Sequence, residues 1–109
     1  MMSEFEKAWD KAGLDDRDLK NLQLEILTNP EAGKVVKGTG GLRKIRFATE
    51  GKGKSGGLRI LYVDFVAFEK IYLITAYQKG KKDNLSASER GKIKELIEAL
   101  EQILKRRWY

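Results

Sequence analysis

A cluster of basic side chains lies in the middle of the sequence, where it could bind phosphate groups. Residues 43–59 contain one acid, Glu50, and the cations Arg43, Lys44, Arg46, Lys52, Lys54 and Arg59. More basic residues follow Tyr77, namely Lys79, Lys81 and Lys82. Arginine presents a planar fork that can hold a phosphate with two hydrogen bonds, and lysine adds a point charge. The pattern predicts a site for a polyanion, of which nucleic acid is the usual one.

The charge of the chain is concentrated in one segment. The 109 residues have a formal net charge of +6. Residues 32–82 contain twelve basic and three acidic side chains, whereas residues 1–31 contain four basic and eight acidic ones. A solvated lysine-rich surface would also be basic, but its positive charges would not need to be concentrated in one segment of the chain. The asymmetry favours a polyanion-binding face.

Gly53-Lys54-Ser55 has the letters that end a nucleotide-binding phosphate loop, but its context excludes that function. The motif needs an earlier glycine at the position where this chain has Ala48. It also needs a following helix, whose N-terminal amides hold the phosphates. Two glycines and an expected strand follow here instead. The remaining alternatives are a phosphate-binding loop of another kind and a flexible charged hairpin without a ligand.

The missing residue types restrict the possible chemistry. The chain has neither histidine nor cysteine, which excludes histidine-dependent catalysis, thiol nucleophiles and disulfides. The basic segment lacks an acidic cluster for Mg²⁺ or Mn²⁺, so we expect no metal and no cofactor. RNA supplies its own nucleophile, the 2′-hydroxyl. Crowded cations could act on it as acid, base and clamp, because neighbouring positive charges lower the pKa of a lysine from its usual value of about 10.4.

Three helices are expected from apolar residues at three- and four-residue spacing. The first follows a capping box at Ser3 and stops at Gly13, and the second runs from the Asp15–Asp16 pair to Asn29, before a proline. The last begins at a capping box on Ser86 and presents a stripe that faces the core or a partner helix.

Strands are expected at residues 42–47, 58–65 and 70–77, with a short edge strand at residues 35–36. A hairpin between the last two long strands would bring Lys79 near Arg59 and the loop that contains Lys52 and Lys54. We therefore expect an α+β fold in one domain, residues 1–109, whose small antiparallel sheet has one packed and one open face. No apolar run reaches membrane-spanning length and no signal peptide is recognisable, so we expect a cytoplasmic protein without a membrane partner.

Two segments, GTGGLRKIRFATEGKGKSGGLRILY (38–62) and IYLITAYQKGKKDNLSASE (71–89), closely resemble the HigB-like branch of the RelE/ParE superfamily of toxin–antitoxin toxins. The resemblance covers most of the chain. It implies a RelE-like microbial-ribonuclease-type fold, with two N-terminal helices packed on a small antiparallel sheet and a C-terminal helix. It also implies a type II toxin, a ribosome-dependent and metal-independent endoribonuclease that cleaves mRNA in the decoding site and inhibits translation.

The resemblance also implies roles for four basic residues. Lys52 or Lys54 would remove a proton or stabilise charge, Arg59 would clamp the phosphate, and Lys79 would be a second clamp or the donor to the leaving group. We expect RNA or ribosome contacts from Arg43, Lys44, Arg46, Tyr77, Lys81 and Lys82. Related toxins often stack a C-terminal tyrosine or His–Tyr pair on the nucleotide. This chain ends instead in Trp108 and Tyr109, so the aromatic role stays open.

The implied partners are the ribosome, mRNA and a cognate antitoxin of the HigA-like, helix-turn-helix kind. Two other functions remain possible on the same sequence. One is a gyrase poison of the ParE kind, which generally lacks the Lys/Arg constellation. The other is a non-catalytic RNA-binding domain.

Overall fold

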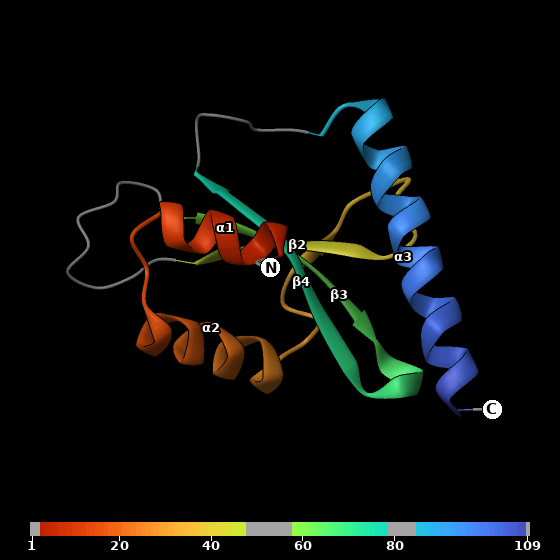
Figure 1. Cartoon of the computed structure of the whole chain (residues 1–109), viewed down its shortest axis with the longest axis horizontal. Coiled ribbons are helices and arrows are strands. Elements are labelled where there is room, and N and C mark those ends of the chain that lie inside the picture. Colours follow the sequence, from red (N-terminus) through yellow and green to blue (C-terminus); the bar gives the residue numbers. More distant parts are fainter. Residues whose placement is uncertain (1–2, 48–57, 79–84, 109) are drawn as a thin grey trace.

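The computed structural model describes residues 3–47, 58–78 and 85–108, in which a four-stranded antiparallel sheet is covered by helices (Figure 1). The helices are α1 (Glu4–Lys11), α2 (Asp16–Thr28) and α3 (Ala87–Trp108). The strands are β1 (Lys34–Val35), β2 (Leu42–Phe47), β3 (Leu58–Phe65) and β4 (Lys70–Gln78), with a 3-10 turn, η1 (Val66–Phe68), between the last two. The strands lie in the sheet in their order along the chain. The predicted α+β fold is confirmed.

Each helix begins at the cap that its sequence predicts. Ser3 Oγ accepts from the Glu6 amide at 3.2 Å, and the Glu6 carboxylate accepts from the Ser3 amide at 3.3 Å. The same reciprocal pair joins Ser86 to Glu89 at the start of α3. In α2 the cap is Asp15, whose carboxylate accepts from the Asp18 amide at 3.0 Å. These bonds satisfy backbone N–H groups that have no partner inside a helix.

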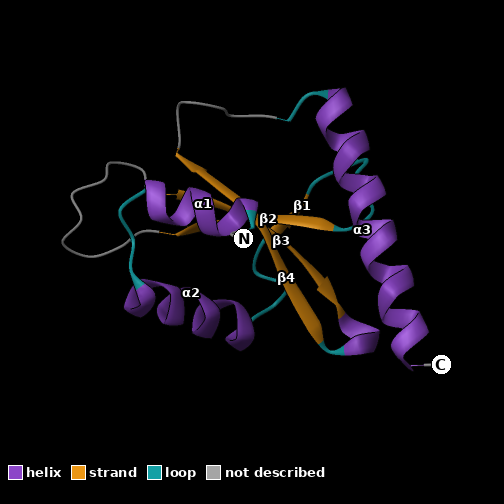
Figure 2. Ribbon diagram, viewed as in Figure 1, coloured by secondary structure: helices purple, strands orange, loops and turns teal. Residues whose placement is uncertain are grey.

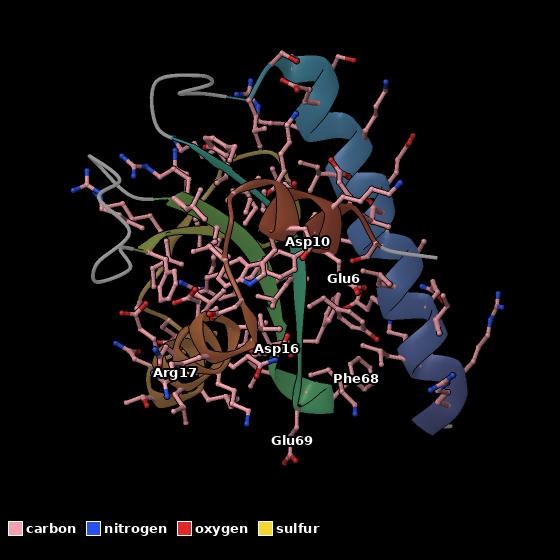
Figure 3. The ribbon with its side chains drawn as sticks, turned by 60° about the vertical axis from the view of Figure 1, so that its left-hand side comes forward. Glu6, Asp10, Asp16, Arg17, Phe68 and Glu69 are labelled. Atoms are coloured by element: carbon pink, nitrogen blue, oxygen red, sulfur yellow. The ribbon has the colours of Figure 1, made fainter. Side chains whose placement is uncertain are left out.

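The first core cluster fills the space between the sheet and the two N-terminal helices. Phe5 and Trp9 of α1 stack with ring centroids 5.4 Å apart, and Trp9 also stacks on Phe47 of β2 at 5.9 Å. Leu22 and Ile26 of α2 are fully buried in the same cluster. The acidic outer sides of the helices therefore face away from the sheet, as Figure 3 shows for Asp10 and Asp16.

The second core cluster lies under α3, and it corrects the expectation of an open sheet face. Apolar residues occupy both faces of β3, with Leu58, Ile60 and Tyr62 in the first cluster and Leu61, Val63 and Phe65 in the second. Ile97 and Leu104 of α3 pack on the second group, and Phe68 lies between the hairpin and α3 (Figure 3). A strand that is apolar on both faces must be covered on both.

One buried tyrosine holds the connection between α2 and the sheet. The side chain of Tyr62 is completely buried in β3, and its hydroxyl accepts from the Gly33 amide at 3.0 Å and donates to the Pro30 carbonyl at 2.8 Å. A Cβ added at Gly33 would lie 2.7 Å from this hydroxyl. The close approach requires glycine at position 33, because any larger residue would displace the ring.

Removing this hydroxyl should weaken the fold. We expect Tyr62→Phe to lower the free energy of unfolding by about 1 to 3 kcal/mol, because the Gly33 amide and the Pro30 carbonyl lose a buried partner. Urea denaturation followed by circular dichroism measures the change. Tyr72→Phe on β4 is the matched control, since the Tyr72 ring contacts Phe65 edge-on and its hydroxyl donates no hydrogen bond to a described residue. Equal losses in the two variants would contradict the proposed clamp.

Candidate nucleic-acid interface

The register of the sheet places Arg46, Arg59 and Tyr77 in one row. Arg46 of β2 lies opposite Arg59 of β3, and Arg59 lies opposite Tyr77 of β4. Residues directly opposite in antiparallel strands project to the same face, with Cβ atoms about 4.5 to 5.5 Å apart. The row lies on the face that α3 covers further along, because Tyr77 packs against the second core cluster. Arg46 is exposed, whereas Arg59 and Tyr77 are partly buried.

A second row of cations lies beside the first on the same face. Lys34 of β1 is opposite Lys44 of β2, and Lys44 is two residues from Arg46. Like charges directly across a ladder destabilise a sheet. Two like-charged pairs, Lys34 with Lys44 and Arg46 with Arg59, therefore concentrate positive charge on this face.

Arg43 lies on the opposite face of β2 from Lys44 and Arg46. Its guanidinium donates from Nη1 to the Gly33 carbonyl at 2.7 Å and to the Glu31 carbonyl at 3.2 Å. These bonds fix the segment between α2 and β1, to which the Tyr62 hydroxyl is also bonded. The structure thus separates Arg43 from the other cations of the predicted RNA-binding set and gives it a structural contact.

Several predicted site residues lie outside the described residues: Lys52, Lys54, Lys79, Lys81 and Lys82. The described strands still define where their segments attach. Residues 48–57 join Phe47 to Leu58, which face each other across the ladder, and Lys79 follows Gln78, which pairs with Leu58. Both segments therefore start from the end of the sheet that carries Arg46 and Arg59.

β4 pairs with β3 on one side, and no described strand pairs with its other edge. Two hollows of about 450 Å³ each flank this outer edge. One lies toward α1 and includes Lys7 and Lys11, and the other lies toward α3 and includes Lys92 and Leu96. Tyr77 borders both hollows, as does Glu4, so Tyr77 connects the cationic row to each of them. Sequence reasoning missed the hollows, because their walls come from α1, β3, β4 and α3, which are far apart in the chain.

The described part of the chain contains no group of three or more acidic side chains placed to hold a metal ion. Within the same residues, no helix is both long and apolar enough to cross a bilayer.

The described elements form a small α+β protein whose sheet carries Lys34, Lys44, Arg46 and Arg59 on one face. The model of the family described as the RelE toxin of the RelE / RelB toxin-antitoxin system matches residues 2–107. The chain therefore belongs to the RelE toxin family. Membership implies a toxin of a type II toxin–antitoxin system, with an antitoxin as its partner.

The different positions of Arg43 and Arg46 can be tested directly. We expect Arg43→Ala to lower the free energy of unfolding by about 1 kcal/mol, because two charge-assisted hydrogen bonds to carbonyls are lost from a partly exposed site. The matched control, Arg46→Ala on the exposed side of the same strand, should change it by less than about 0.5 kcal/mol. Urea denaturation of both variants gives the comparison. A larger loss for Arg46→Ala would contradict the assignment of Arg43 as the structural arginine.

Proposed function

We propose that this toxin is a ribosome-dependent endoribonuclease of the HigB-like kind, which cleaves mRNA in the decoding site without a metal ion. The observation that carries the proposal is the row formed by Arg46, Arg59 and Tyr77. It combines two cations and an aromatic ring at the sheet end from which the lysine-containing segments start. Membership of the RelE toxin family supports the same activity.

The chemistry that this face must perform is transesterification of the RNA backbone. The 2′-oxygen loses its proton and forms a bond to phosphorus, the bond from phosphorus to the 5′-oxygen breaks, and the departing oxygen takes up a proton. The products carry a 2′,3′-cyclic phosphate and a 5′-hydroxyl. Because RNA provides both the nucleophile and the leaving group, the protein needs only a base, an acid and donors for the phosphoryl oxygens.

Arg59 suits the role of the phosphate clamp. It is partly buried on a central strand, so its backbone is fixed by ladders on both sides. A guanidinium on a rigid strand can donate two parallel hydrogen bonds to phosphoryl oxygens as their negative charge grows. Arg46 would add charge from the neighbouring strand. The proton transfers fall to Lys52 or Lys54 and to Lys79, as proposed from the sequence.

Tyr77 is suited to contact a base next to the scissile phosphate. Its ring is partly exposed and lies opposite Arg59, while one side packs on the second core cluster. An aromatic ring fixed in this way can stack on a nucleotide at little entropic cost.

The partner that restrains the toxin is an antitoxin, which we propose to be HigA-like.

The decisive experiment maps mRNA ends by primer extension on translating ribosomes. We expect the wild-type protein to produce cuts in phase with codons, and Arg59→Ala to reduce their rate by at least about a hundredfold, the typical loss for one oxyanion donor. Lys105→Ala, an exposed lysine on α3 away from the sheet end, is the charge-matched control and should cleave normally.

Protein folding is checked in the same samples. The thermal midpoint of Arg59→Ala should stay close to that of the wild type, and a melted variant would mean that Arg59 is structural. Growth arrest with intact mRNA and altered DNA topology would overturn the proposal in favour of gyrase poisoning. Absence of both arrest and cleavage would indicate a non-catalytic RNA-binding domain.

A further inference from the structure

The glycine-rich turn before β2 lies against α3, away from the row of Arg46, Arg59 and Tyr77. Figures 1 and 2 show this turn beside α3, and two contacts place it. A Cβ added at Gly38 would lie 3.9 Å from Nε of Arg90, and one added at Gly40 would lie 3.5 Å from Cγ of Lys94. The turn therefore sits under a face of α3 that carries two cations one helical turn apart.

The sign of the dihedral angle φ alternates from Lys37 to Gly40, as it does in an anion-binding nest. It is positive at Gly38 (76°) and Gly40 (77°) and not positive at Lys37 and Thr39, and it is positive again at Gly41 (121°). Backbone of alternating handedness directs successive N–H groups to one side, where they form a concave site for an anion. Gly38 and Gly40 are exposed, and their amides donate no hydrogen bond to another described residue, whereas Thr39 between them is fully buried.

Thr39 fixes the turn in this shape. Its side chain is fully buried, and Oγ1 donates to the Val36 carbonyl at 2.6 Å and accepts from the Leu42 amide at 3.1 Å. The threonine satisfies the Val36 carbonyl and the Leu42 amide at the base of the turn. The turn is thus held in shape before any ligand arrives, which lowers the entropic cost of binding one.

Three cations surround the turn. Lys37 and Lys94 are exposed, and Arg90 is partly buried because its Nη1 donates to the Leu85 carbonyl at 2.9 Å. Within the described part of the chain none of the three forms an ion pair with a carboxylate, although Glu98 lies one helical turn beyond Lys94. Three positive charges and the exposed backbone of Gly38 and Gly40 at one place form a field that suits a phosphate group.

From this arrangement we propose a second phosphate-binding site, which consists of residues 37–41 with Arg90 and Lys94 and binds the backbone of RNA. The inference rests on the proposed function for the identity of its ligand. The site shares the α3 side of the sheet with Lys34, Lys44, Arg46 and Arg59, so one strand of RNA or two neighbouring strands can contact both regions. Its phosphate belongs either to the mRNA beyond the cleaved bond or to ribosomal RNA.

A titration of the nitrogen-15-labelled protein with oligouridylate tests the site itself. We expect the amide resonances of Gly38, Gly40 and Gly41 to shift and saturate. The double variant Lys37→Ala/Lys94→Ala should bind at these amides on the order of tenfold more weakly, and its slope of log affinity against log salt should fall by about 1.5. Arg90 is left in place because it also bonds the Leu85 carbonyl.

The control double variant, Lys105→Ala/Arg106→Ala, removes the same charge from exposed positions at the C-terminal end of α3. It should leave the glycine shifts and the affinity at the turn unchanged. Glycine resonances that do not move at saturating RNA, or an equal loss in both double variants, would overturn the inference. The thermal midpoints of both variants show that each is folded.

Sedimentation with ribosomes separates the two possible sources of the phosphate. If Lys37→Ala/Lys94→Ala loses affinity for ribosomes without mRNA, the site binds ribosomal RNA. If the loss appears only on ribosomes programmed with mRNA, the site binds mRNA. Unchanged sedimentation in both cases would overturn the inference. A wild-type protein that binds ribosomes through this turn but leaves mRNA intact would refute the proposed nuclease and not the phosphate site.

Discussion

The pairing of β3 with both of its neighbours is the constraint on which the rest of the molecule depends. β3 is apolar on both faces, so it is stable only in the middle of a sheet with helices on either side. A shift of one residue in its register would move Leu58, Ile60 and Tyr62 out of the first core cluster. The same shift would separate Arg46, Arg59 and Tyr77. Core packing therefore fixes the positions of Arg46, Arg59 and Tyr77 relative to one another.

The alternation of side chains along the strands then sorts the charges. Arg43 and Arg46 are three residues apart on one strand and project to opposite faces, where one holds backbone carbonyls and the other is exposed. The acidic helices α1 and α2 cover the face of Arg43, while Lys34, Lys44, Arg46 and Arg59 share the other. The sheet thus separates an acidic side of the molecule from a basic one. The repulsion within the rows of cations is an energetic cost of gathering these side chains on one face.

Much of the fold follows from local patterns. The strands at 42–47 and 58–65 were predicted with the bounds that the structure has, because turn-forming residues and glycines delimit them. The fourth strand extends one residue further than expected, to Gln78, and the edge strand occupies Lys34–Val35 instead of 35–36. The open face was predicted wrongly. Leu61, Val63 and Phe65 look like ordinary strand residues until α3 is placed over them, and local periodicity gives no information on that packing.

The sequence by itself determined the helix caps, the strands and the chemistry available to the site, since these depend on residue types and on contacts within a few positions. It also predicted that Arg59 lies near the end of β4, because two strands joined by a short connection pair antiparallel. Only the tertiary structure decided which face of the sheet each arginine occupies and which cations of α3 meet the glycine turn before β2. Those outcomes depend on the direction in which distant elements pack, and burial of apolar surface across the whole domain sets that direction.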